Sequence, residues 1–152
     1  MWKPVAGLMM TMLFVASVGT VAGADRARIE FLNSGLVLPA SLPFSEAVRV
    51  DGTLYLSGQV GVKPGTTQIV PGGMKAEARQ TMENIRSSLS AHGYSMEDVV
   101  RCTIMLADMS DWNAFNEIYR TYFKEHYPAR SAFGVNGLAL NARVEVECTA
   151  AR

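Results

Sequence analysis

The sequence predicts an α+β domain in which two helices pack on one face of a sheet, and three observations support this prediction. Residues 74–91 carry apolar side chains at helical spacing. Residues 99–106 and 144–150 alternate in the manner of strands. The predicted elements follow the order strand, strand, helix, strand, helix, strand, strand, which is typical of the α+β class. With 152 residues, of which 49% are hydrophobic, the chain is long enough for one domain with its own core.

The first predicted element is a β-hairpin. Residues 47–50 and 54–60 are short segments of alternating apolar side chains, and Asp51-Gly52 between them is a strong signal for a two-residue turn. Residues 25–43, which precede the hairpin, contain Asn33-Ser34-Gly35 and two prolines. We therefore expect turns in residues 25–43 rather than a core element.

Residues 74–91 predict the first helix. Apolar residues recur there at spacings of four, three and four, at Ala78, Met82, Ile85 and Leu89. His92-Gly93 follows the common pattern in which a left-handed glycine stands just past the last helical turn. We therefore expect the helix to end at this pair.

Residues 99–106 predict the next strand, which we expect to be central in the sheet. One of its faces carries Cys102, Ile104 and Leu106. The other face carries Arg101, Thr103 and Met105. Because both faces are partly apolar, we expect this strand to be covered on two sides.

A second helix is predicted before Pro128, with Asp108, Ser110 and Asp111 as candidate caps at its start. Its apolar stripe is aromatic, which is more typical of a core than of a cofactor site: Trp112, Phe115, Tyr119, Tyr122 and Phe123. Two strands, near 131–135 and 144–150, are expected to follow. The sheet face away from the helices is of mixed polarity, so the sequence leaves open whether a partner subunit covers it.

The first 24 residues have the features of a secretory signal peptide. Lys3 provides a short basic start, residues 5–18 are apolar, and Ala22-Gly23-Ala24 matches the small-residue pattern at which signal peptidase cuts. The sequence therefore predicts a signal peptide over residues 1–24, a mature domain over residues 25–152 and a periplasmic or secreted protein, with no membrane association after cleavage. An uncleaved membrane anchor and a misassigned start codon are the alternatives.

Charge and residue types argue against several classes of function. Without Lys3 the chain has 13 basic and 14 acidic residues, and its Lys and Arg residues are scattered, so nothing in it attracts nucleic acid or anionic lipid. Cys102 and Cys148 lie in separate predicted strands, and His92 and His126 lie near predicted helix ends. These positions indicate no metal site, and no Ser/His/Asp or Cys/His set. Catalysis would depend on Arg, carboxylates, hydroxyls and backbone groups.

The main candidate for a functional site is a turn followed by a strand. Within residues 127–133, Pro128 makes a rigid turn that presents Arg130. Within residues 144–147, strand alternation places Glu145 on the face opposite the two valines. A guanidinium can grip a carboxylate at two points, and a partly buried Glu can hold and transfer a proton. A small-molecule site is one interpretation, and a plain Arg130–Glu145 salt bridge is the alternative that the pattern leaves open.

Five motifs resemble those of the reactive intermediate deaminase family, also called the YjgF/YER057c/UK114 family, in order and spacing. They are Ser57-Gly58-Gln59, Ala78-Arg79-Gln80 with Asn84, Asn116 with Tyr119, Pro128-Ala129-Arg130-Ser131, and Val144-Glu145-Val146-Glu147. The resemblance, which covers nearly all of residues 47–150, implies a chorismate-mutase-like mixed sheet and a homotrimer with clefts between neighbouring subunits. It also implies hydrolysis of 2-imino acids, the tautomers of enamines, to 2-keto acids and ammonia without a metal or an organic cofactor.

The resemblance further implies roles for individual residues. Arg130 would hold the substrate carboxylate, and Glu145 would position or activate the attacking water. The other residues of the pocket would be Phe44, Ser57, Gly58, Asn116 and the backbone at Ala132. A non-catalytic trimer that binds a small ligand or a protein partner is the alternative function.

The sequence departs from the family pattern at two places. Leu42-Pro43-Phe44 stands where the family has Gly-Pro-Tyr, so a pocket tyrosine has lost its hydroxyl, which bears on substrate preference. The loop over residues 136–141 lacks the usual Pro-rich form. An exported protein also lacks the cytosolic dehydratases that supply reactive enamines to typical members.

The two cysteines form a separate expectation. The family fold would place Cys102 and Cys148 close together on the helix-covered face of neighbouring strands. An oxidising compartment favours a disulfide, but neighbouring strands rarely give a suitable geometry. We therefore expect two buried free thiols.

Overall fold

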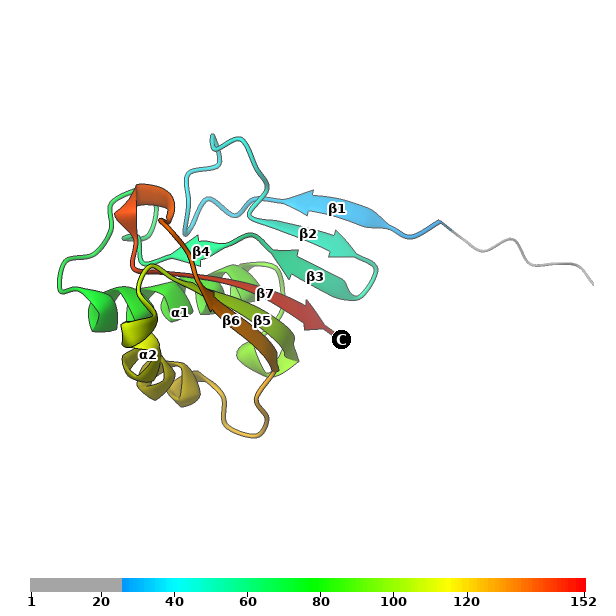
Figure 1. The fold of residues 1–152 in the computed structure, drawn as a ribbon. Helices are drawn as coiled ribbons and strands as arrows, with labels where there is room; N and C mark the ends of the chain where they lie inside the picture. The colour runs from blue at the N-terminus through cyan, green and yellow to red at the C-terminus, as the bar shows by residue number, and fades with distance from the viewer. Residues whose placement is uncertain (1–25) are drawn as a thin grey trace, which may run out of the picture.

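A seven-stranded sheet forms the framework of the molecule, whose computed structural model describes residues 26–152 (Figure 1). The predicted signal peptide lies outside the described residues. The strands are β1 (Ile29–Leu32), β2 (Ala47–Val50), β3 (Thr53–Leu56), β4 (Gln59–Val60), β5 (Val99–Leu106), β6 (Ala129–Gly134) and β7 (Val144–Ala151). Their order is β1-β2-β3-β7-β5-β6, and β4 also pairs with β7. The β5–β6 pair is parallel and the other pairs are antiparallel, so the sheet is mixed.

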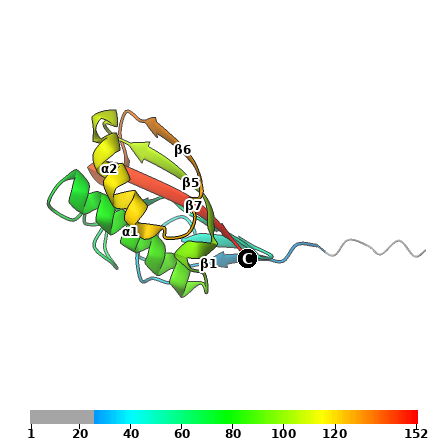
Figure 2. The same ribbon diagram turned by 90° about the horizontal axis from the view of Figure 1, so that it is seen from below.

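Two helices, α1 (Met74–Ala91) and α2 (Trp112–Tyr119), cover the same face of this sheet (Figure 2). The part of the chain that the structure describes also has four single turns of 3₁₀ helix: Met96–Asp98, Met109–Asp111, Arg120–Tyr122 and Ala139–Asn141. The main core lies between the helices and the sheet, and it contains the predicted α1 stripe at Ala78, Met82, Ile85 and Leu89. The predicted α+β class and the placement of both helices are confirmed.

The bounds of α1 agree with the prediction because its C-terminal signal is strong. Gly93 has a φ of 84°, in the left-handed region that favours glycine. The Gly93 N–H donates to the Ser90 carbonyl (3.1 Å), and the Tyr94 N–H donates to the Leu89 carbonyl (2.9 Å). This pair of hydrogen bonds is the Schellman motif, which satisfies carbonyls of the last turn.

Three predictions about the other elements were wrong in part. Residues 25–43 contain the edge strand β1, which escaped notice because Ile29 and Phe31 point to solvent and only four residues are paired. The α-helical part of the second helix ends at Tyr119, and a 3₁₀ turn continues the helix to Tyr122. Strand β5 is central, but only one of its faces is covered within residues 26–152.

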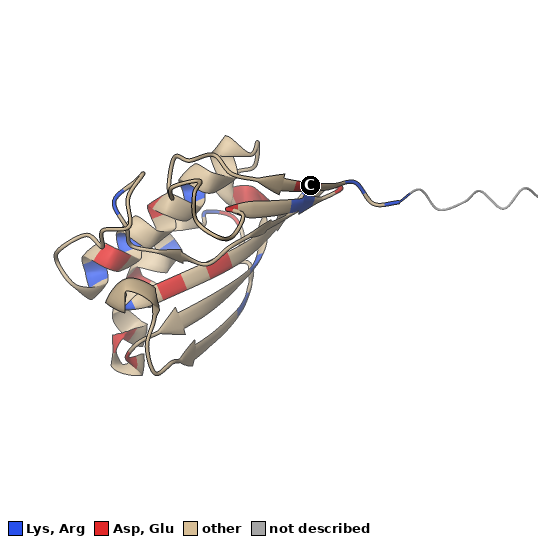
Figure 3. Ribbon diagram, turned by 90° about the horizontal axis from the view of Figure 1, so that it is seen from above, with Lys and Arg blue, Asp and Glu red and all other residues tan. Residues whose placement is uncertain are grey.

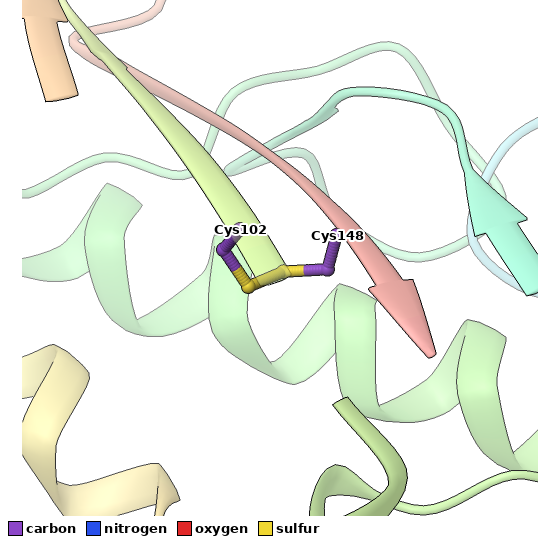
Figure 4. Close-up of a disulfide and its surroundings, with 2 residues drawn as sticks. All are labelled: Cys102 and Cys148. Carbon is purple, nitrogen blue, oxygen red and sulfur yellow. A yellow bond between two sulfur atoms is a disulfide. The ribbon is translucent and has the colours of Figure 1, made fainter. Parts of the chain in front are cut away.

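The prediction of free thiols was also wrong, because Cys102 and Cys148 form a disulfide between β5 and β7 (Figure 4). The two residues lie directly opposite each other in the antiparallel register, and their Cα atoms are 4.1 Å apart. Opposite residues of an antiparallel pair alternate between wide and close spacing, and the close pairs bring the two side chains together. The general rarity of cross-strand disulfides therefore gave the wrong expectation at this position.

The surface carries charges of both signs. Basic and acidic positions are interspersed over the part of the chain drawn in colour (Figure 3). Among the described residues, no helix combines the length and the apolar character that crossing a bilayer requires.

Candidate active site

All of the predicted site residues except Ala132 line one of two separate cavities. Phe44, Ser57, Gly58 and Glu145 line a cavity of about 390 Å³, which we call the glutamate cavity. Asn116 and Arg130 line another of about 550 Å³, which we call the arginine cavity. The structure thus brings the predicted residues together as two half-sites.

Glu145 lies on β7, where alternation turns Val144 and Val146 into the core and leaves the carboxylate half-buried on the other face. Gly58 lies against the carboxylate, and a Cβ added at Gly58 would overlap Oε1 of Glu145. A side chain at position 58 would have to displace the tip of Glu145, so glycine keeps the carboxylate beside the backbone. Ser57 donates its hydroxyl to the Ser45 carbonyl (2.7 Å), so its oxygen can still accept a hydrogen bond in the cavity.

The surroundings of Glu145 favour its protonated form. Burial removes water from the carboxylate and raises its pKa, and the charge of Glu147 two residues along the same face raises the pKa further. A carboxyl group with a raised pKa can accept and return a proton nearer neutral pH than an ordinary Glu. Glu145 therefore has the properties of a general base.

Arg130 lies on β6 and is held in place by three side chains of α2. Its Nη1 donates to Oδ1 of Asn116 at 2.8 Å. Its Cζ lies 4.7 Å from the ring centroid of Trp112 and 4.8 Å from that of Tyr119. Aromatic faces attract a guanidinium at these distances, so the two rings fix its orientation. A guanidinium has five N–H donors, and those not directed to Asn116 can bind a carboxylate.

Trp112 and Tyr119 are part of the arginine half-site, although the sequence predicted Trp112 only as a core residue and Tyr119 as a core residue in a family motif without a role in the site. Burial raises the pKa of Tyr119 to about 12, against the opposing effect of the Arg130 charge. The phenol is therefore neutral at physiological pH, and within residues 26–152 its buried oxygen has no hydrogen-bond partner. The helical spacing of Trp112 and Tyr119 could not distinguish a core stripe from a platform for Arg130, because the same side chains serve both purposes.

Arg130 and Glu145 point to opposite faces of the sheet. Arg130 is in register with Cys102 of β5, and Glu145 is in register with Met105. Cys102 and Met105 are three residues apart on one strand, so they and their cross-strand partners face opposite sides. None of the ion pairs formed within residues 26–152 includes Arg130 or Glu145. The salt-bridge alternative is therefore wrong for a single chain.

Ala132 lies two residues after Arg130 on β6 and lines neither of the two cavities. Its side chain is half-buried and packs against the main core. It is in register with Ile104 of β5, as Arg130 is with Cys102. Ala132 and Arg130 therefore lie on the same, helix-covered face of the sheet. The predicted contact through its backbone remains a prediction.

A buried carboxylate outside the predicted site, Glu46, ties the segment before β2 to α1. It accepts hydrogen bonds from the N–H and the hydroxyl of Ser34, both at 2.6 Å, and from the hydroxyl of Ser88. Burial acts to raise its pKa, but these hydrogen bonds and the nearby His92 together lower it. The network was not predicted because its members are 12 and 42 residues apart in the sequence.

Acidic, histidine and cysteine side chains do not gather into a metal site in the part of the chain that the structure describes. Among residues 26–152, no group of three such side chains has an arrangement that could hold an ion.

Comparison of the sequence with known proteins finds one protein-family model and several relatives that match most of the chain. A protein-family model described as Endoribonuclease L-PSP matches residues 36–152. A Mus musculus protein named 2-iminobutanoate/2-iminopropanoate deaminase is 48% identical over 113 residues, which cover 74% of this chain and 84% of the mouse protein. The Homo sapiens protein of the same name is 45% identical over 108 residues, which cover 71% of this chain and 79% of the human protein.

Solved structures agree with these matches. RidA from the Antarctic bacterium Psychrobacter sp. PAMC 21119 has a TM-score of 0.76 and 36% identity, over 81% of this chain and 99% of that protein. Yeast Mmf1 has a TM-score of 0.78 and 31% identity, over 82% of this chain and 99% of that one. E. coli TdcF with bound serine has a TM-score of 0.75 and 30% identity, over 81% and 98%. The mixed sheet with two helices is the fold of these structures.

Proposed function

The chain belongs to the family described as Endoribonuclease L-PSP, and we propose that it is an imine deaminase that hydrolyses 2-imino acids to 2-keto acids and ammonia. The names of the mouse and human relatives support this reaction. The two half-sites also suit it chemically. A 2-imino acid has one carboxylate to bind and one electrophilic carbon to attack, so an arginine and a general base provide what the reaction needs.

Arg130 holds the substrate carboxylate in this proposal. Its guanidinium is already oriented by Asn116 and by the two aromatic rings, so little conformational freedom is lost when the substrate binds. Two parallel N–H donors fit the two oxygens of a carboxylate and fix its plane. The backbone near Ala132, two residues after Arg130 on β6, then contacts the imine end of the substrate.

Glu145 activates the attacking water. The carboxylate takes a proton from water as the water oxygen bonds to the imine carbon, which turns the C=N bond into a C–N single bond. The protonated carboxyl returns this proton to nitrogen, which gives a neutral carbinolamine. The carboxylate then takes the hydroxyl proton and passes it to nitrogen, so the C–N bond breaks and ammonia leaves as the C=O bond forms. Ser57 accepts a hydrogen bond from the water or the nitrogen, and Phe44 flanks the substrate.

One observation carries the assembly part of the proposal: Arg130 and Glu145 face opposite sides of one sheet. A substrate can touch both only where the arginine cavity of one copy meets the glutamate cavity of another. The open sheet face, which no element of residues 26–152 covers, is the surface available for that contact. We propose a homotrimer with three such clefts, and its threefold symmetry follows the family resemblance.

Export is the second part of the proposal, with residues 1–24 as the signal peptide and residues 25–152 as the mature domain. Disulfides persist in oxidising compartments and are rare in the cytosol. The Cys102–Cys148 disulfide therefore agrees with a periplasmic or secreted location. Mass spectrometry of the protein from its native source should find a mature N-terminus at Asp25, and a soluble protein that retained Met1 would contradict this.

The deaminase proposal is tested with purified residues 25–152. Iminopropanoate and iminobutanoate are generated in situ, and the release of ammonia and 2-keto acid is followed above the spontaneous rate. We expect acceleration of both substrates and a trimer mass by light scattering at micromolar protein. Ligand binding without acceleration would favour the non-catalytic alternative, and a monomer that hydrolyses imines would rule out the shared cleft.

A further inference from the structure

The glutamate cavity is strongly apolar, although it contains the proposed general base. Among residues 26–152, Glu145 is the only ionisable side chain that lines it. Its polar lining otherwise consists of Ser57 and Thr67, with Gly58 beside the carboxylate. The remaining walls come from three segments far apart in the sequence: Leu38, Leu42 and Phe44 before β2, Val60 on β4, and Ala139 and Leu140 before β7.

Leu140 is the most unusual residue of these walls. Its backbone has a φ of 58° and a ψ of 21°, in the left-handed region that residues with a side chain seldom adopt, and Asn141 has a φ of 56°. The Leu140 side chain is 50% exposed, so it contributes little to the core of the chain. Backbone strain of this kind concentrates at functional sites, where it fixes the direction of a side chain.

Phe44 complements Leu140 at the same cavity. Phe44 is 46% exposed, although a large apolar residue is normally more stable when buried. Two exposed apolar side chains at the rim of one apolar cavity, on segments almost 100 residues apart, offer a surface that an apolar ligand would cover.

The size of the cavity indicates which part of a substrate covers this surface. Its volume of about 390 Å³ lies within the range of small-molecule pockets, about 300–1,000 Å³. A side chain of one or two carbons would leave most of the apolar wall in contact with water. A branched or aromatic side chain would contact the wall while the reacting carbon lies beside Glu145.

We infer that this protein, given its proposed deaminase function, prefers 2-imino acids with large apolar side chains, and that Phe44 and Leu140 select them. Such imines arise when enzymes oxidise the amine of leucine- or phenylalanine-type amino acids. Dehydration of serine- or threonine-type amino acids gives only imines whose side chains have one or two carbons. The reaction that supplies this protein is therefore an amino-acid oxidation, which also removes the need for a cytosolic dehydratase.

The test compares imines produced in situ by an L-amino-acid oxidase from alanine, leucine and phenylalanine. The readout is kcat/KM, from the loss of semicarbazide-trapped imine. Because one methylene in an apolar pocket is worth about 10-fold in specificity, we expect the leucine- and phenylalanine-derived imines to exceed the alanine-derived imine by about 10-fold or more. Equal values, or a preference for the alanine-derived imine, would overturn the inference and leave the deaminase function intact. No hydrolysis of any imine would overturn both.

Two matched variants test the role of Leu140. Leu140→Asn removes the apolar side chain and keeps a residue that tolerates left-handed backbone, so the fold is retained. We expect it to lower the leucine-to-alanine ratio of kcat/KM by about 10-fold. Leu36→Asn changes another exposed leucine outside the cavity and should keep the wild-type ratio. A wild-type ratio in Leu140→Asn, with its folding confirmed by thermal melting, would overturn the assignment of Leu140.

Discussion

The two faces of the sheet are built from the same strands but serve different purposes. On the helix-covered face, β5 and β7 contribute only buried side chains: Cys102, Ile104, Leu106, Val144, Val146, Cys148 and Ala150. On the open face, the alternate positions of the same strands carry polar and charged side chains among few apolar ones: Arg101, Thr103, Met105, Glu145, Glu147 and Thr149. Stability is therefore concentrated on one face, and a carboxylate with a raised pKa is available on the other.

This difference shows why one copy of the chain holds only half of each proposed site. Arg130 extends from the edge strand β6 on the helix-covered side, where α2 positions it. Glu145 lies on the open side. Changes at these two residues should affect catalysis with little effect on stability, whereas changes on the covered face of β5 and β7 should do the reverse.

The largest expected effect is the loss of catalysis caused by Arg130→Ala. Loss of two charge-assisted hydrogen bonds and of substrate orientation should lower kcat/KM by about 10³-fold or more. Arg130→Lys keeps the charge but loses the planar grip, and should lower kcat/KM by about 10²-fold. Thermal melting of both variants should stay close to wild type because Arg130 is exposed. Wild-type imine hydrolysis by Arg130→Ala would remove this residue from the mechanism.

Glu145→Gln should have the next largest effect, again on catalysis. The amide can hydrogen-bond water but cannot take its proton, so turnover should fall by about 10²-fold. Binding of a non-reactive 2-keto acid, measured by calorimetry, should persist because Arg130 is intact. Equal losses of binding and turnover would instead indicate that Glu145 shapes the cleft.

On the covered face, the largest effect should come from the Cys102→Ala/Cys148→Ala double variant. The disulfide joins residues 46 apart, and a closed loop of this length stabilises the folded state by about 4 kcal/mol. The melting temperature should fall by roughly 15 °C, while kcat/KM at 25 °C changes little. Ile104→Val, on the same face, should cost only about 1 kcal/mol and serves as the control for general loosening of the core. An unchanged melting temperature in the double variant would mean that the two thiols are not joined.

The sequence was sufficient to predict the parts of the fold that depend on local patterns. Residues 74–91 were predicted as a helix with the bounds that the structure gives, because an apolar stripe and a glycine end signal coincide there. Strand β1 was missed because Ile29 and Phe31 lie at a solvent-exposed sheet edge, where apolar alternation does not mark a core-facing side. The disulfide was missed because the close register of Cys102 with Cys148 is a tertiary property.

The candidate site was predictable by residue type but not by arrangement. The Pro128 turn and the alternation around Glu145 identified both principal residues. Their faces depend on the register of β5 with both β6 and β7, which no local pattern encodes. The role of Trp112 and Tyr119 as a platform for Arg130 was likewise not predicted, because both belong to an aromatic stripe typical of a core, although Tyr119 is also part of a family motif.

A smaller effect is expected from Glu46→Gln, and it should depend on pH. The Glu46 carboxylate accepts three hydrogen bonds in a buried site, and its pKa lies below the ordinary 4.5. A lowered pKa stabilises the folded state above pH 4.5, and this stabilisation is lost as pH falls through the folded-state value. We expect the variant to be less stable by about 2 kcal/mol at pH 7, measured by urea unfolding, with a smaller difference below pH 4.5. A difference independent of pH would mean that Glu46 acts through packing alone.

The smallest expected effect has the opposite sign and belongs to Glu145, on the open face. Its pKa is raised above 4.5 by burial and then by Glu147, so the folded state binds a proton more readily than the unfolded state. Its contribution to stability is fully present below pH 4.5 and is lost as pH rises through the raised pKa. At pH values above the raised pKa, Glu145→Gln should therefore be more stable than wild type, in contrast to Glu46→Gln.

Glu147→Gln tests the same carboxylate through catalysis, because it removes the second cause of the raised Glu145 pKa. In wild type, kcat/KM should fall with decreasing pH at a value above 4.5, and in Glu147→Gln this fall should occur at lower pH. An acidic limb that stayed in place in Glu147→Gln would show that another group limits activity at low pH, and the contrast between the two glutamates would then concern stability alone.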